Sequence, residues 1–218
     1  MFLSKDIVTD SLYTYGLSSI AQIRADNIRE TLNTLEFDII IPSNQFHIST
    51  TLRGKANIAN ILAATSYLLS QQVPITQIQE SIRKFSGLPG RFEMIQTKRC
   101  GGIYLDRADN LTSLEQVFES ISGIESRGRI ITLFGVDESS SGESLDRISM
   151  CLDTNSDIII LSETIRHEQF ISRELLQSSS RINRREGKDF WIIPTREDAI
   201  RTALIMLQPH DILLICGS

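Results

Sequence analysis

The chain has 218 residues, a net charge of −5 and 41% hydrophobic residues, enough for one medium domain or two small ones. No apolar run reaches the roughly 20 residues that a membrane span needs, and the first residues lack the basic and apolar regions of a secretory signal. The acidic balance argues against a nucleic-acid-binding protein. We therefore expect neither a membrane nor a nucleic acid as a partner.

The cysteines indicate a reducing compartment. Cys100, Cys151 and Cys216 are odd in number and form no CxxC pair, so neither a disulfide framework nor a zinc site is predicted. Cys151 and Cys216 lie in apolar segments and are expected to be buried thiols. The three histidines have no metal-binding spacing either. A cytoplasmic protein without a bound structural metal fits these observations best.

The first 85 residues read as a β-rich layer followed by two helices. Residues 21–28, 36–41 and 45–52 are candidate strands, and residues 55–71 form a long helix with an alanine patch. Pro74 then opens a second helix over residues 75–85, since proline suits the first turn of a helix. This layer is too small to stand alone, and we expect it to be the tail of a larger domain.

A compact turn separates this part from the rest of the chain. The stretch SGLPG, residues 86–90, combines turn-forming residues and marks the expected domain boundary. Residues 92–97 and 102–106 read as two strands, and residues 113–124 read as a helix. The chain is therefore divided into residues 1–86 and residues 87–218.

Beyond residue 128, apolar strands alternate with amphipathic helices. Continuous apolar strands of this kind are typical of a parallel sheet that is covered on both faces. With right-handed crossovers they predict a doubly wound, mostly parallel α/β domain of the Rossmann-like type. The expected strands are residues 129–136, 157–163, 189–195 and 211–217, and the expected helices are residues 142–155, 167–185 and 196–208.

Three motifs, in a fixed order, resemble the Mur ligases. They are LRGKANIANILAATSYLL, FSGLPGRFEMI and GGIYLDRADN, starting at Leu52, Phe85 and Gly101. The Mur ligases are ATP-dependent, amide-forming ligases of peptidoglycan precursor synthesis, and the chain is most similar to their UDP-N-acetylmuramoyl-tripeptide synthetase branch. The resemblance implies that residues 1–86 are a remnant of the central ATPase domain. Residues 87–218 would then be the Mur ligase C-terminal α/β domain.

The resemblance also implies a nucleotide site. Asn57 and Asn60 match family asparagines that face the adenine, Arg91 matches the linker arginine that reaches the phosphates, and Asp106 matches an aspartate at the nucleotide. A guanidinium offers a planar fork for phosphate oxygens. ATP and magnesium are implied by the family alone. Without the family pattern, Asn57 is equally a helix cap, Arg91 an exposed ion-pair partner and Asp106 the start of a turn.

Two further positions match the amino-acid-binding part of the family. Arg166 stands where the family's DNPR motif places the arginine that meets the incoming carboxylate, although here the motif reads ETIR. Gly217 matches the first glycine of the closing GKGHE motif. Arg166 is also free to pair with Glu168 or with another surface carboxylate.

The chain departs from the family where the chemistry lies. It contains no GxxxxGK[ST] segment, and so no lysine-bearing loop for the β and γ phosphates. The family's DYAHxP motif reads DRADNL here, and the loop expected to be basic carries Asp137, Glu138 and Glu143. At ~4 Å and an effective dielectric constant of about 20, each contact with an anion would cost roughly 4 kcal/mol. An anionic precursor peptide is therefore a poor ligand for this loop.

These observations leave three functions open, and whether the chain is an enzyme stays undecided. The first is a truncated, non-catalytic Mur ligase-like protein that acts by binding or within an assembly. The second is the C-terminal part of an active tripeptide ligase whose P-loop region lies on a missing segment or a partner chain. The third is a binding module that uses the carboxyl edge of its sheet. Its candidate rim is formed by Asp106, Asp137, Glu163 and Arg166, and this acidic rim would favour a cation or an amine over a phosphate. Self-association, or a protein partner that covers the incomplete first layer, is expected in the first case.

Overall fold

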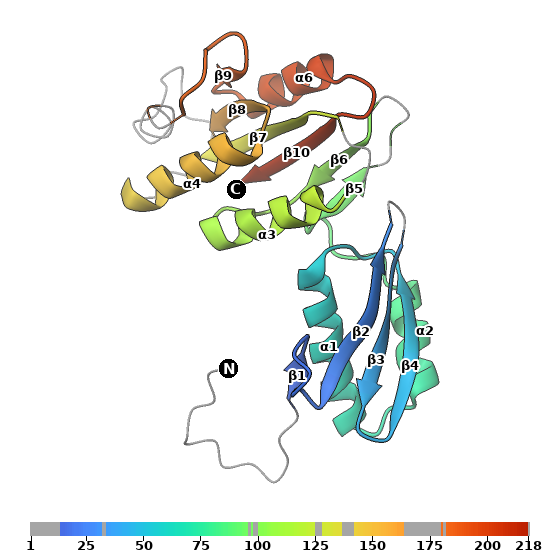
Figure 1. The fold of residues 1–218 in the computed structure, drawn as a ribbon. Helices are drawn as coiled ribbons and strands as arrows, with labels where there is room; N and C mark the ends of the chain where they lie inside the picture. Colours follow the sequence, from blue (N-terminus) through green and yellow to red (C-terminus); the bar gives the residue numbers. More distant parts are fainter. Residues whose placement is uncertain are drawn as a thin grey trace. The chain divides into compact units, whose positions relative to one another are not determined.

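The computed structural model describes residues 14–31, 34–95, 97, 100–124, 128–136, 142–163, 180 and 182–217, with the backbone alone for 142–144 and 163. The chain folds into two units, an N-terminal unit, Met1–Ser86, and a C-terminal unit, Gly87–Ser218. Figure 1 shows both as ribbons. Within the described ranges, no helix combines the length and the hydropathy needed to cross a membrane.

The N-terminal unit is a four-stranded sheet with two helices on one face (Figure 1). The strand order is β1-β2-β3-β4, with β1 parallel to β2 and the other pairs antiparallel. Alternate residues of β3, which are Leu35, Phe37 and Ile39, are completely buried, as the period of two in a strand requires. The elements are β1 (Tyr15–Gly16), β2 (Ile23–Glu30), β3 (Leu35–Ile41), β4 (Asn44–Thr50), α1 (Lys55–Ser70) and α2 (Ile75–Lys84).

The helix-free face of this sheet is polar. Asp38 on β3 accepts a hydrogen bond from Asn27 Nδ2 at 2.8 Å and pairs with His47 Nδ1 at 3.0 Å. The hydrogen bonds from Asn27 and His47 lower the pKa of Asp38. Polar cross-strand partners replace apolar ones because this face meets water.

The C-terminal unit is a doubly wound, mostly parallel sheet, as the sequence predicts. Its strand order is β5-β6-β10-β7-β8-β9, and only β5 runs antiparallel to its neighbour among these strands. Helices α3 and α4 cover one face and α6 covers the other (Figure 1). The elements are β5 (Glu93–Ile95), β6 (Gly102–Leu105), α3 (Leu111–Ser122), β7 (Ile130–Val136), α4 (Gly142–Asn155), β8 (Ile158–Glu163), β9 (Phe190–Ile192), α6 (Arg196–Met206) and β10 (Ile212–Gly217).

Charged side chains fasten the strands together at the amino edge of this sheet. Asp211, before β10, is 2% exposed and accepts hydrogen bonds from the backbone amides of Arg129 and Gln208. Its carboxylate also meets the Arg129 guanidinium, with Nη2 at 2.6 Å from Oδ2. The Asp211 carbonyl accepts from Gly101 N at 2.8 Å. This single residue therefore links the starts of β6, β7 and β10.

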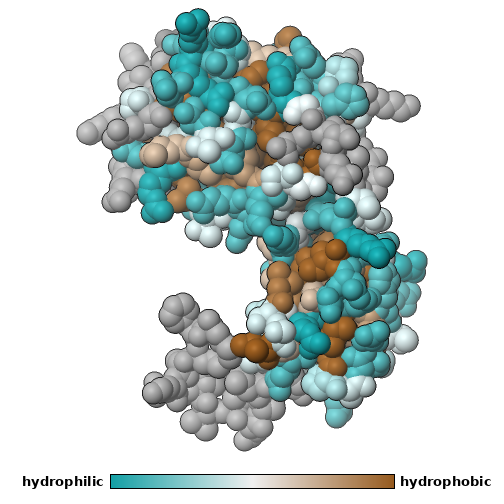
Figure 2. Space-filling view, in the orientation of Figure 1, coloured by the Kyte–Doolittle hydropathy of each residue, from teal (hydrophilic) through white to brown (hydrophobic). Residues whose placement is uncertain are grey.

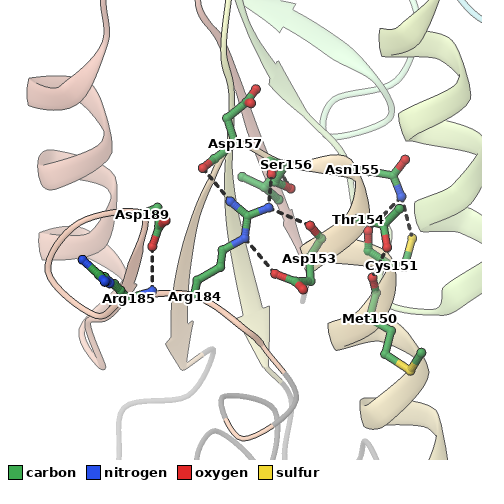
Figure 3. A network of polar contacts seen from close by, with 11 residues as sticks. Met150, Cys151, Asp153, Thr154, Asn155, Ser156, Asp157, Arg184, Arg185 and Asp189 are labelled. Carbon is green, nitrogen blue, oxygen red and sulfur yellow. Dashed lines mark hydrogen bonds and ion pairs between the residues drawn. The ribbon is translucent and has the colours of Figure 1, made fainter.

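A second set of polar contacts, made by Arg184, binds the C-terminal end of α4 at the same edge of the sheet (Figure 3). The Arg184 guanidinium donates from Nε to Asp153 Oδ1 at 2.7 Å, and from its terminal nitrogens to the carbonyls of Asp153, Ser156 and Asp157. These carbonyls lie at or beyond the helix C-terminus, where backbone acceptors lack intrahelical partners. A cation there also suits the helix dipole.

The Arg184 contacts explain one wrong boundary. A helix was predicted over residues 167–185, but residues 182–185 are not helical. Arg184 turns toward α4, and the Arg185 amide donates to Asp189 Oδ1 at 2.7 Å, which closes a turn instead. The rest of that prediction, apart from Ser180, lies outside the described residues. The edge strand β1 was missed because two residues carry no readable period.

Candidate functional site

The linker turn at residues 87–91 is held by local hydrogen bonds in the C-terminal unit. Gly87 and Gly90 have φ values of 97° and 68°, a region that favours glycine. Arg91 N donates to Leu88 O at 3.1 Å, and Gly90 N donates to Glu93 Oε2 at 2.8 Å. The turn therefore fixes the backbone of Arg91 while leaving its side chain exposed.

Asp106 joins this turn to the end of β6. Its Oδ2 accepts from Phe92 N at 2.7 Å, and its own amide donates to Ile215 O on β10 at 3.0 Å. Phe92 has a φ of 44°, a strained value for an aromatic residue, which the bond to Asp106 helps to hold. Burial raises the pKa of Asp106, against opposing effects of the Phe92 and Ala108 amides and of the Arg91 charge.

Asn57 and Asn60 lie on α1 in the N-terminal unit, and their side chains also have partners within the chain. Asn57 Nδ2 donates to Arg53 O at 2.7 Å, and Asn57 Oδ1 accepts from Asn60 Nδ2 at 3.4 Å. Asn57 is partly buried, whereas Asn60 is exposed. The alternative that Asn57 caps α1 is wrong, because the N-cap residue is Gly54 and no side chain caps this helix. Asn57 instead donates to the backbone carbonyl four residues earlier, a common local contact of asparagine.

At the carboxyl edge of the C-terminal sheet, two glycines meet. Gly217 on β10 is the register partner of Gly135 on β7, and Gly217 has a φ of 87°. A Cβ on Gly217 would clash with the backbone carbonyl of Gly135. Gly217 thus has a packing reason to be glycine, beside the substrate-binding role that the family resemblance implies.

The sequence interpretation missed Arg196, the first residue of α6. Its Nη1 donates to Ser162 Oγ on β8 and its Nη2 donates to Cys216 O on β10, both at 3.1 Å. Burial lowers the pKa of Arg196. Its position at the start of a predicted helix could have pointed to it. A cation in the first turn of a helix is unfavourable with respect to the helix dipole, so an arginine there indicates a specific contact.

Several residues of the predicted site lie outside the described part of the chain. They are Arg166 and residues 137–141, together with the side chain of Glu163. Among the cysteines, Cys216 is buried as predicted, whereas Cys151 is only partly buried. Burial raises the pKa of both thiols, so neither is an activated nucleophile.

The described residues do not fit the phosphates and metal ion of a family nucleotide site. The 218 residues hold no lysine-bearing glycine loop, and the described ranges contain no group of three His, Cys, Asp or Glu side chains that would hold a metal ion. Asn57 and Asp106 are engaged in hydrogen bonds within the chain. Among the matching nucleotide positions that the structure describes, the exposed side chains are those of Asn60, which matches an adenine-facing residue, and Arg91, which matches the phosphate-binding arginine.

A Rossmann-like α/β unit with polar groups at the carboxyl edge places the chain in the class of doubly wound, ligand-binding folds. Residues 90–218 match the Mur ligase glutamate ligase domain, and residues 3–68 match the Mur ligase middle domain. The first match alone covers more than half of the chain. The chain therefore belongs to the Mur ligase family, which consists of ATP-dependent ligases.

Individual relatives agree with this assignment. A UDP-N-acetylmuramoyl-L-alanyl-D-glutamate–2,6-diaminopimelate ligase of Clostridium acetobutylicum is 27% identical over 98% of this chain and 44% of its own length. A UDP-N-acetylmuramyl-tripeptide synthetase of Roseiflexus is 27% identical over 100% of this chain and 43% of its own. The chain thus spans less than half the length of either relative.

A solved structure supports the fold. Mycobacterium tuberculosis folylpolyglutamate synthase complexed with ADP superposes with a TM-score of 0.75 at 14% identity, over 91% of this chain and 46% of that one. At this identity the likeness concerns the fold alone.

Proposed function

We propose that this chain is a Mur ligase-like protein that acts by binding and does not by itself catalyse ATP-dependent amide formation. The proposal rests on the residues that match the family's nucleotide site, because two of them already have hydrogen-bond partners within the chain. Asn57 Nδ2 donates a hydrogen bond to Arg53 O, and the Asp106 carboxylate accepts one from Phe92 N, both at 2.7 Å. The 218 residues also lack the loop that would hold the β and γ phosphates.

Asp106 illustrates why the two roles compete. If its carboxylate turned toward a nucleotide, Phe92 N would lose its acceptor while Phe92 stayed at a φ of 44°. An unsatisfied amide in a partly buried position costs about 1–3 kcal/mol. The Asp106 carboxylate therefore keeps its hydrogen bond to Phe92 N unless a ligand contributes more binding free energy than the loss of that bond costs.

Turnover of the purified 218-residue chain tests the proposal. ADP release is measured with ATP, magnesium, a UDP-N-acetylmuramoyl dipeptide and a mixture of amino acids. We expect no release above that of the matched variant Arg91→Ala, which removes the exposed arginine at the linker turn. Release that is well above the Arg91→Ala value and depends on the dipeptide would overturn the proposal.

The second candidate is the C-terminal part of an active tripeptide ligase. The observation that favours it is the coverage, because the chain aligns with 44% and 43% of the two ligase relatives. Adding a separately purified polypeptide that carries a glycine-lysine loop provides the test. Dipeptide-dependent ADP release that appears only in the mixture, and is lost with Arg91→Ala, would support this candidate over the first.

We also propose that a protein, or a second copy of the chain, covers part of the N-terminal unit. Tyr15, Leu17 and Ile20, in and after β1, are exposed by 50%, 49% and 76%, and Tyr67 on α1 is exposed by 66%. Figure 2 shows apolar surface on the side of this unit where β1 and α1 lie. Sedimentation of the chain and of its Ile20→Ser variant tests self-association, which the variant is expected to weaken.

A reducing cytoplasm is the proposed location, since Cys100, Cys151 and Cys216 are free thiols. The intact mass of the protein from its own cells, under alkylating conditions, would reveal a disulfide if this were wrong.

A further inference from the structure

We propose that Gln79 on α2 shields the outer edge of β4 and so keeps this strand from pairing with β4 of a second copy of the chain. β4 is an edge strand, because its one neighbour among the described strands is β3. An unpaired edge presents backbone N–H and C=O groups to which another strand can bind. The inference goes beyond the proposed function, and it concerns the edge of the sheet opposite to β1.

The backbone groups that point outward from β4 follow from its hairpin with β3. Ile41 and Asn44 are register partners across a two-residue turn, and such a pair is of the hydrogen-bonded kind. Hydrogen-bonded and non-hydrogen-bonded pairs alternate along an antiparallel ladder. Gln45, His47 and Ser49 therefore direct their N–H and C=O groups away from β3.

The sequence of β4 lacks the residues that commonly protect an edge. Asn44–Thr50 reads NQFHIST, with no Lys, Arg, Asp, Glu or Pro, and its register with β3 is continuous over all seven residues. The strand can also pair with itself. In an antiparallel pair of two copies centred on His47, Gln45 faces Ser49 of the second copy, and no two carboxylates or ammonium groups oppose each other.

Gln79 occupies the acceptor at the centre of that arrangement. Its Nε2 donates to His47 O at 2.8 Å. In the symmetric pair, His47 O would instead accept from the His47 amide of the second copy. Asn44 protects the edge locally, because its Oδ1 accepts from Gln45 N at 2.8 Å. Side chains of the same chain thus bond both a donor and an acceptor of this edge.

The packing of α2 sets the position of Gln79. This helix packs against β4 (Figure 1), and Ile78, next to Gln79, is 1% exposed. Ile75 and Ile82, about one turn before and after, pack against the apolar core of the N-terminal unit. These core contacts hold Gln79 beside the edge of β4.

Removing the Gln79 side chain should allow β4 to pair. The test measures self-association of the 218-residue chain by sedimentation, in an Ile20→Ser background that weakens association through the surface of β1 and α1. Gln79→Ala is expected to raise the association constant by about tenfold or more. A neutral hydrogen bond changes an equilibrium by about fivefold, and the symmetric pair involves two such bonds.

Gln77→Ala is the matched control, since Gln77 is an exposed residue of the same helix. It is expected to leave the association constant unchanged within about twofold. Equal association constants for Gln79→Ala and Gln77→Ala would overturn the proposal. Adding His47→Lys to Gln79→Ala should abolish the gain, because two ammonium groups would then oppose each other at the centre of the pair. A gain that survives His47→Lys would place the contact elsewhere than at β4 and would also overturn the proposal.

Gln79→Met covers the case in which Gln79→Ala does not fold. Methionine keeps the length of the side chain and suits a helix, but it donates no hydrogen bond. Hydrogen exchange of the His47 and Ser49 amides is followed as the concentration of this variant rises. Protection that increases with concentration supports the proposal, because both amides point outward from β4. Protection that does not change with concentration refutes it.

Discussion

Arg184 offers the sharpest test of how the C-terminal unit is held together. In Arg184→Ala, the carbonyls of Asp153, Ser156 and Asp157 at the end of α4 lose their donor, and Asp153 loses its ion pair. The Arg184 side chain is 17% exposed, so water replaces these contacts only in part. Figure 3 shows the four contacts converging on one guanidinium.

The magnitude follows from the contacts. Neutral hydrogen bonds contribute about 1 kcal/mol each and those to charged groups about 1.5–3 kcal/mol, and contacts of one side chain do not add fully. We expect Arg184→Ala to lower the free energy of unfolding by about 3 kcal/mol. With an m value of about 2 kcal/mol/M in urea, the midpoint falls by about 1.5 M.

The assay is urea unfolding followed by Trp191 fluorescence, which reports on this unit. Arg184→Lys keeps the charge but not the planar fork, so a loss of about 2 kcal/mol is expected. Arg185→Ala is the control, because the Arg185 contact with Asp189 is made by its backbone amide. If Arg184→Ala and Arg185→Ala unfold at the same urea concentration with equal m values, the reasoning fails.

Three further predictions concern the same unit. Gly217→Ala should lower the urea midpoint by at least about 1 M, because the new Cβ meets the Gly135 carbonyl and a φ of 87° strains alanine; an unchanged midpoint would contradict the packing. Asn110→Ala should cost about 1 kcal/mol by the same assay, since Asn110 Oδ1 caps α3 through Ser113 N at 3.0 Å, and Asn110→Asp should restore most of that loss. Burial alone would raise the pKa of Asp211, but hydrogen bonds from the Arg129 side chain and from the Gln208 and Arg129 amides lower it. The stabilisation that the Asp211 carboxylate contributes is therefore present above its unfolded pKa of about 3.9 and is lost as the pH falls through its lower folded pKa. The urea midpoints of wild type and Asp211→Asn should accordingly converge on acidification. A gap between the two midpoints that does not change with pH would contradict the lowered folded pKa.

The sheet of the C-terminal unit was predictable because its strands are buried on both faces. Runs such as residues 130–136 and 158–163 are largely apolar, and the alternating helices leave few other topologies. The short strands were not predictable to the same degree. β9 was expected over residues 189–195 but spans Phe190–Ile192, since Pro194 has no amide for the ladder.

The candidate site was predictable only in outline. The motifs locate Asn57 and Asp106, but not that both side chains have partners at 2.7 Å within the chain. Hydrogen bonds to a backbone atom four residues away or fourteen residues away leave no mark in the sequence. Arg196 shows the reverse failure. Its segment was recognised as part of a helix, yet its contacts with Ser162 Oγ and Cys216 O become visible only when β8, β10 and α6 are assembled.

The two edges of the C-terminal sheet differ in how their charges are satisfied. At the amino edge, Asp211 with Arg129 and Arg184 with Asp153 are paired and bonded to backbone groups that would otherwise be unsatisfied. At the carboxyl edge, the described contacts of Arg196 are to neutral oxygens. Proteins concentrate unsatisfied or strained groups where function requires them and stabilise them elsewhere. The charged groups of the amino edge thus stabilise the starts of the strands, whereas the described contacts that position Arg196 are hydrogen bonds to neutral groups.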